Sequence, residues 1–275
     1  MKKVTKDILI SNSKKISTAL IISSSLLSGS AIAHSNNINI SSDNCNIALQ
    51  HTVRIQPNTI EIQTPNNQVM RIEQNGNLYI NNKIVALNQQ DQDSIEDYAD
   101  NLREQLPQVA TIALEGVKIA GVAITEVSNV FGLNNIDSMT ELMDELSVEI
   151  HNQFYQDGTF VMSQQEFDSI ENTFNESFEN KMEEAMQSAV MDSIGSLLMA
   201  LGSEMIGAGG DMNEFENRMQ RMGEQIEEKV ETQAKNLEQK AHTFCSSMKQ
   251  LAKQEDQIQE FLPELKAYDL FAVNH

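Results

Sequence analysis

Basic residues are scarce in this sequence. It contains 19 Lys and Arg against 40 Asp and Glu, which gives a formal net charge of −21 at pH 7. A surface this acidic repels the phosphates of nucleic acids and of anionic lipid headgroups, so no nucleic-acid partner is expected. Cationic ligands, divalent ions and basic partners remain open. The simplest interpretation is a charged, solvated surface that keeps the protein soluble.

The residue patterns that carry familiar chemistry are also missing. The sequence has no glycine-rich nucleotide-binding loop, no metal-ligand cluster and no catalytic constellation. His242 lies three residues before Cys245, and a Cys–His nucleophile pair there is the nearest approach to a catalytic site. The sequence therefore assigns no catalytic, cofactor-binding or metal-binding residue, and it favours a protein that is not an enzyme.

Methionine, by contrast, is abundant, with 14 residues. Clustered thioethers can bind Cu(I), but most of these residues fall on apolar helical stripes, where Met fills gaps and offers an adaptable contact surface. We therefore expect core or protein contacts from the Met residues of the long helices, which are Met182, Met186, Met191, Met199, Met205, Met212, Met219 and Met222. The acidic pairs Glu183-Glu184 and Glu227-Glu228 lack a calcium-binding loop and indicate solvated helix faces.

The first 33 residues have the three-part plan of a cleavable secretory signal. Five Lys residues precede an apolar stretch, and small residues end it at Ala33, so cleavage would leave His34 as the new terminus. Serines interrupt the apolar stretch, which is too short for the roughly 20 apolar residues of a membrane anchor. No Cys stands at the cleavage point, which argues against a lipoprotein. We expect an exported protein of net charge −25, because the signal holds five Lys and one Asp, with no stable membrane insertion after cleavage.

Only two cysteines are present, Cys45 and Cys245. In an oxidising compartment two thiols usually pair, so we expect a disulfide bond that ties the N-terminal segment to the last long helix. The alternative is two buried, unpaired thiols. The absence of a Cys-x-x-Cys motif argues against a catalytic redox role.

Residues 34–88 form the expected β segment. Apolar and polar residues alternate over 51–87, and Asn75-Gly76 supplies a strong hairpin signal. We predict a small antiparallel meander of four or five strands. Such a sheet needs a covering element to be stable, and a helix packed on it is the expected cover.

Residues 89–275 form the expected helical body. The periodicity predicts helices over 93–105, 107–131, 137–154, 163 to about 206, and 211–255, with one extra strand over 159–162. We predict an α+β, predominantly α fold in which the meander packs on an elongated bundle. Its long antiparallel hairpin, about 163–255, would have a coiled-coil seam with a stutter. Whether this seam closes within one chain or between two is open. The helix over 107–131 is interpreted as a core helix, with membrane contact as the alternative.

Several motifs together resemble the YggN-like family of uncharacterised, predicted periplasmic proteins of gamma-proteobacteria. They are Asp43-Asn44-Cys45, Val53-Arg54-Ile55-Gln56-Pro57, the hairpin from Gly76 to Lys83, Tyr98-Ala99-Asp100-Asn101-Leu102-Arg103, Leu106-Pro107 and Cys245. The resemblance implies a periplasmic location in the Gram-negative envelope and a domain of unknown function. It carries over no catalytic residue.

These observations lead to one main hypothesis and two alternatives. The main hypothesis is a non-enzymatic periplasmic protein that presents a helical hairpin to a protein partner or to another copy of itself. A periplasmic chaperone-like holdase is the first alternative. An enzyme with dispersed catalytic residues is the second.

Overall fold

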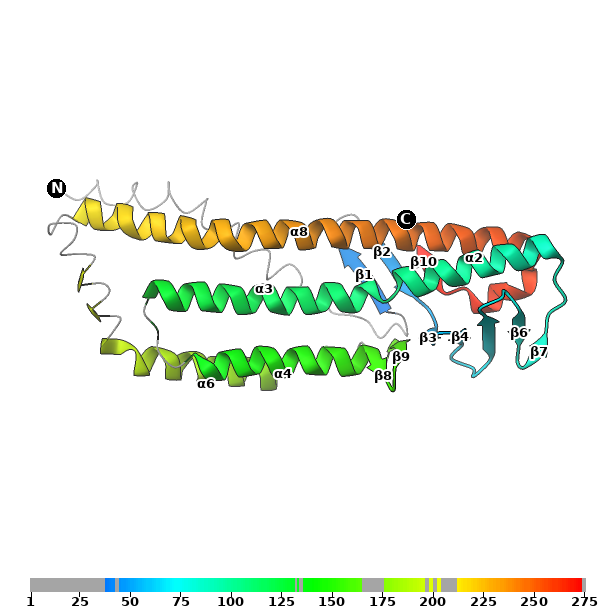
Figure 1. Ribbon diagram of the computed structural model, residues 1–275, viewed down its shortest axis with the longest axis horizontal. Coiled ribbons are helices and arrows are strands. Elements are labelled where there is room, and N and C mark those ends of the chain that lie inside the picture. Colours follow the sequence, from blue (N-terminus) through cyan, green and yellow to red (C-terminus); the bar gives the residue numbers. More distant parts are fainter. Residues whose placement is uncertain are drawn as a thin grey trace, which may run out of the picture.

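The computed structural model describes residues 38–42, 45–131, 133, 136–164, 176–195, 198–199, 202–203 and 212–273. Figure 1 shows an elongated molecule whose helices run along its long axis, with most of the β-strands gathered toward one end. The predicted α+β, predominantly helical architecture is confirmed. The expected signal, with its cleavage point at Ala33 and His34, lies outside the described residues.

The predicted meander forms the larger of two sheets. Five consecutive strands pair antiparallel with their neighbours: β3 (Thr52–Ile55), β4 (Thr59–Gln63), β5 (Val69–Glu73), β6 (Leu78–Ile80) and β7 (Lys83–Ile84). A later hairpin, β8 (Tyr155–Gln156) and β9 (Thr159–Met162), joins the free edge of β3, which gives the order β7-β6-β5-β4-β3-β9-β8. The strand predicted over 159–162 is therefore confirmed as β9.

The smaller sheet was not predicted from the sequence. It consists of β1 (Ile38–Ser42), β2 (Cys45–Leu49) and β10 (Phe271–Val273), with β2 in the centre. Both pairings are antiparallel, and Phe271 stands opposite Leu49. The two ends of the described chain therefore meet in one sheet.

The helices largely follow the predicted spans. They are α2 (Gln89–Gln105), α3 (Gln108–Phe131), α4 (Asp137–Phe154), α6 (Glu176–Asp192), α8 (Met212–Phe261) and the 3-10 helix η1 (Pro263–Tyr268). Helix α2 begins four residues before the start at residue 93 that the sequence predicted. Asn88 caps it instead, because its side-chain oxygen accepts a hydrogen bond of 3.0 Å from the backbone N–H of Asp91.

One face of the seven-stranded sheet is buried against α2, the last turns of α8 and η1. Alternate residues of β3, β4 and β5 are buried, as period-2 patterning requires. The residues that meet there include Ile60, Ile62, Met70, Ile72, Leu78, Ile95, Leu102, Leu251, Ile258 and Leu265. The expectation that a helix covers the meander is therefore met by two helices.

The helices of the bundle pack in other pairs than the sequence predicted. Helix α8 packs along α2 and α3, α3 also packs along α4, and α4 packs along α6. Figure 1 shows α3 between α8 and the α4–α6 pair. Helices α6 and α8 therefore do not close on each other as the long hairpin expected over about 163–255. Helix α6 packs instead on α4, and α8 on α3. Residues 165–175, 196–197, 200–201 and 204–211 of that span lie outside the described residues.

The most apolar helix, α3, is also held by charged residues. Glu126 of α3 pairs with Lys229 of α8 at 2.6 Å, and Glu115 of α3 pairs with Lys240. The described helical stretch over residues 89–130 is long and apolar enough to cross a membrane by length and composition, and 11% of its most apolar window is buried.

Two glycines with similar left-handed backbone conformations allow a test of the close contact between the meander and α2. Gly76 has φ +74°, and a Cβ atom there would lie 2.5 Å from the backbone oxygen of Gln92 in α2. Gly158 has φ +77°, and nothing lies within 4 Å of the equivalent position. We predict that Gly158→Ala lowers the free energy of unfolding by about 1 kcal/mol, the usual cost of a left-handed Ala.

Gly76→Ala should cost more, about 3 kcal/mol, because the hairpin must also move away from α2. Urea denaturation of both variants measures the difference. Equal losses would show that the close approach of Gly76 to Gln92 does not constrain the fold.

Candidate functional site

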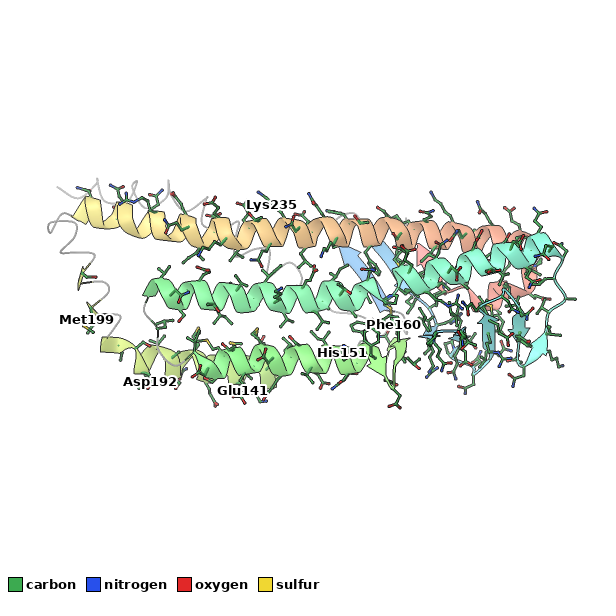
Figure 2. The ribbon with its side chains drawn as sticks, viewed as in Figure 1. Glu141, His151, Phe160, Asp192, Met199 and Lys235 are labelled. Atoms are coloured by element: carbon green, nitrogen blue, oxygen red, sulfur yellow. The ribbon has the colours of Figure 1, made fainter. Side chains whose placement is uncertain are left out.

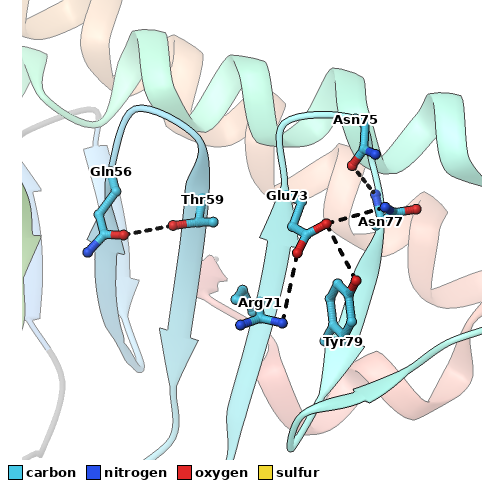
Figure 3. Close-up of polar contacts among 7 residues, drawn as sticks. All are labelled: Gln56, Thr59, Arg71, Glu73, Asn75, Asn77 and Tyr79. Carbon is cyan, nitrogen blue, oxygen red and sulfur yellow. Dashed lines mark hydrogen bonds and ion pairs between the residues drawn. The ribbon is translucent and has the colours of Figure 1, made fainter.

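The outer face of the meander carries a network of polar side chains (Figure 3). Glu73 accepts hydrogen bonds from the Asn77 amide at 3.3 Å and from the Tyr79 hydroxyl at 3.4 Å, and it lies 3.9 Å from the Arg71 guanidinium. Arg71 also stacks over the Tyr79 ring, 4.3 Å from its centroid. Glu73 therefore connects residues of β5, β6 and the turn between them, and the network stabilises the β5–β6 hairpin.

A hollow of about 560 Å³ opens beside this network. Its lining residues are Asn58, Thr59, Glu73, Gln74, Asn75 and Glu96. The lining contains amides, a hydroxyl and two carboxylates but no thiol, imidazole or amine. The Thr59 hydroxyl donates to the Gln56 side-chain oxygen at 2.9 Å rather than to either carboxylate, so no base activates it in this hollow.

A buried carboxyl group lies where α8, α2 and the C-terminal segment meet. Glu255 of α8 is 6% exposed. Its Oε1 accepts hydrogen bonds from the Tyr98 hydroxyl at 2.9 Å and from the Leu270 N–H at 2.8 Å, and its Oε2 accepts from the Phe271 N–H at 3.1 Å. One side chain thus joins α8 to α2 and to the start of β10.

Burial raises the pKa of Glu255 well above its ordinary value, because the charged carboxylate loses its hydration. The Leu270 N–H opposes this rise, while a hydrogen bond with Asp269 and the charge of Asp269 add to it. The pKa of Tyr98 is also raised well above 10, first by burial and then by Glu255. The surroundings therefore favour a protonated Glu255, which can donate to the Asp269 carboxylate.

This raised pKa predicts the direction of a pH effect on stability. Between the ordinary carboxyl pKa of 4.5 and the raised value, the folded protein keeps a proton that the unfolded chain has lost. Because the folded state binds more protons, the contribution of Glu255 to the free energy of unfolding falls as the pH rises through that window. We predict a smaller fall for Glu255→Gln, which resembles the protonated acid but does not titrate.

Urea denaturation from pH 4.5 to 8 measures this difference, and the comparison cancels the repulsion among the other acidic residues. Glu255→Ala should lose about 3 kcal/mol at pH 4.5, because three buried donors lose their acceptor, and less as the pH rises through the window. Parallel pH curves for the wild type and Glu255→Gln would contradict the role given to Glu255.

The two cysteines expected to pair belong to elements that touch. Cys45 begins β2, which contacts α8, and Cys245 of α8 is 6% exposed in the same apolar core as Ile47 and Leu49. The described part of the chain contains no free cysteine. The side chain of Cys45 lies outside the described residues. His242, the other residue of the possible Cys–His pair, instead lies 3.6 Å from Glu238.

The apolar stripe predicted on the helix after residue 163 is only partly covered. Ala185 and Ala189 of α6 are buried against Met139 and Leu142 of α4. A second set of apolar side chains on and after α6 is exposed to solvent, with exposed fractions from 41% to 72%. We call this set the distal apolar surface, and its members are Met186, Val190, Met191, Ile194, Leu198 and Met199.

The distal apolar surface lies at the end of the bundle away from the sheets. Figure 2 places Met199 and Asp192 at that end, whereas His151 and Phe160 lie toward the sheets. Met186 and Val190 of α6 and Ile194 after it follow one another at intervals of four residues. The sequence predicted an apolar stripe on this helix but could not show that, in the described part of the chain, these side chains are exposed.

Acidic residues surround this surface. Helices α4 and α6 together contain ten Asp and Glu residues and one basic residue, Lys181. Lys181 pairs with Glu145 of α4 at 3.5 Å. Helix α8 differs, with seven Lys and Arg residues against ten acidic ones. Helices α4 and α6 are therefore more acidic for their length than α8.

Metal binding finds no support in the described residues, among which no group of three or more His, Cys, Asp or Glu side chains converges. The pairs Glu183-Glu184 and Glu227-Glu228 are exposed on α6 and α8. Met186, Met191 and Met199 are exposed, whereas Met182 packs partly against the core. Exposed thioethers beside carboxylates form a contact surface better suited to another protein than to an ion.

Together these features define an α+β protein. Helices cover one face of its larger sheet, and at the opposite end of the bundle apolar side chains on and after α6 are exposed. The chain belongs to the DUF2884 family of proteins of unknown function, whose model matches residues 45–271. The expectation of an uncharacterised family is confirmed at this level. No curated protein and no solved structure matches the chain.

Proposed function

We propose that this protein is a non-enzymatic component of the cell envelope that binds another protein through its distal apolar surface. The observation that carries the proposal is the exposure of six large apolar side chains on and after α6, among them Met191 at 70% and Met199 at 72%. Contiguous apolar surface at one end of a folded protein commonly marks a protein-interaction site. The two polar features elsewhere, the hollow beside Glu73 and the buried Glu255, have structural roles.

The proposed location is the periplasm. The signal-like residues 1–33 support export, and the family match supports the broader part of the resemblance to YggN-like proteins. Fractionation of cells that express the full chain tests the location. The expected product is a periplasmic protein that begins at His34.

We also propose that Cys45 and Cys245 form a disulfide bond in the exported protein. The contact between β2 and α8 and the burial of Cys245 beside Ile47 support the pairing. The bond would close a loop of about 200 residues, which corresponds to at most about 5 kcal/mol of stability in the chain-entropy account.

The disulfide gives a direct prediction. Protein purified from the periplasm and denatured without reductant should contain no titratable thiol. Cys45→Ser should leave one titratable thiol, that of Cys245, and should lower the free energy of unfolding by about 2 to 4 kcal/mol. Two titratable thiols in the unaltered protein would overturn the pairing.

The binding surface is tested by crosslinking in living cells. A photoreactive phenylalanine analogue at Val190 or Met191 should give protein adducts after irradiation. The same analogue at Ile84, which is 65% exposed on β7, serves as the matched control and should give few. Tandem mass spectrometry then identifies the crosslinked chain, or shows that it is a second copy.

Equal adducts at Val190 and Ile84, or none at either α6 position, would overturn the proposed function. Adducts spread over many unrelated unfolded proteins would instead support the holdase alternative. Adducts restricted to one protein would support a dedicated partner.

A further inference from the structure

The distal apolar surface combines two properties that together restrict its partner. Its six side chains are apolar, and three of them are Met. Flexible Met side chains adapt to apolar groups of different shape, so such a surface suits an amphipathic helix with several apolar residues on one face. Apolarity alone would not distinguish a second copy of this chain from another protein.

Charge makes that distinction. Helices α4 and α6 have a combined formal charge of −9, from ten acidic residues and Lys181. Glu183 and Glu184 are exposed next to Met186, and Asp192 is exposed next to Met191. Two copies that met through this surface would bring two such charges together. A cationic partner would instead gain from the same field.

We propose that the distal apolar surface binds a cationic amphipathic helix of another protein. The apolar face of that helix would cover Met186, Val190, Met191 and Ile194. Its Lys or Arg residues would face the carboxylates of α4 and α6. This inference rests on the proposed function and adds the chemical class of the partner.

A synthetic peptide of about 14 residues, with Leu at helical spacing and Lys elsewhere, is a suitable probe. Its affinity for the chain beginning at His34 is measured by fluorescence anisotropy. Two peptides serve as controls. One keeps the Leu positions but has Glu in place of Lys, and the other has the same Leu and Lys composition without a helical apolar face. The Lys peptide should bind at least about tenfold more tightly than either control.

Variants of the protein separate the apolar from the charged contribution. Met186→Ser combined with Val190→Ser should weaken binding by about tenfold or more, whereas Ile84→Ser should leave it unchanged. Glu183→Gln combined with Glu184→Gln should weaken binding and reduce its dependence on salt. The matched pair Glu227→Gln with Glu228→Gln, on α8, should have little effect. Circular dichroism confirms that each variant is folded.

The outcomes separate this inference from the proposed function. Adducts at Val190 in cells without binding of the Lys peptide would overturn the cationic helix and leave a protein-binding surface. Equal binding of the Lys and Glu peptides, or equal effects of the α6 and α8 charge variants, would also overturn it. Binding to phosphatidylcholine vesicles through Met186 and Val190 would point to a lipid surface and overturn it as well.

Discussion

The side chain of Glu255 connects parts of the molecule that are far apart in the sequence. It accepts a hydrogen bond from Tyr98 in α2 and two from the backbone of Leu270 and Phe271. The segment that it fixes continues into β10, which pairs with β2 at the other end of the described chain. A buried carboxyl group is unfavourable unless its hydrogen-bonding capacity is used, and here it is used by three donors. Glu255 therefore helps to fix the small sheet against α8.

The helices away from the sheets are packed in a more open way. The contacts run in sequence from α8 to α3, from α3 to α4 and from α4 to α6. Helices that are joined in such a series of pairs have few neighbours, so each helix leaves part of its surface to solvent. For α3 the consequence is partial exposure of an apolar helix, which ion pairs from Glu115 and Glu126 help to hold against α8. For α6, which packs on α4, the consequence is the distal apolar surface.

Local patterns in the sequence were sufficient to predict the meander, α3, α4 and β9. Each of these is specified within a few residues, by alternation, by Asn75-Gly76 or Asp157-Gly158 at a turn, or by helical spacing. The small sheet was missed because β2 pairs with β10 across more than 200 residues, and three apolar residues at the end of a chain carry no strand signal of their own. Glu255 was missed because it lies among charged and polar residues that suggest a solvated face. Local patterns also could not show which helices pack against each other. An apolar stripe shows that a helix has something to bury, but not which helix covers it, and α6 and α8 turned out to pack on α4 and α3.

The two ends of the molecule therefore meet different physical demands. At the sheet end, Glu73 is contacted by Arg71, Asn77 and Tyr79, and the apolar residues are covered from both α2 and α8. At the other end, exposed apolar side chains and exposed carboxylates lie on the same helix, α6. A solvated acidic face alone needs no partner, and an isolated exposed Met needs none either. Their combination on α6 is the basis of our proposal, because a cationic amphipathic helix would cover the apolar side chains and face the carboxylates.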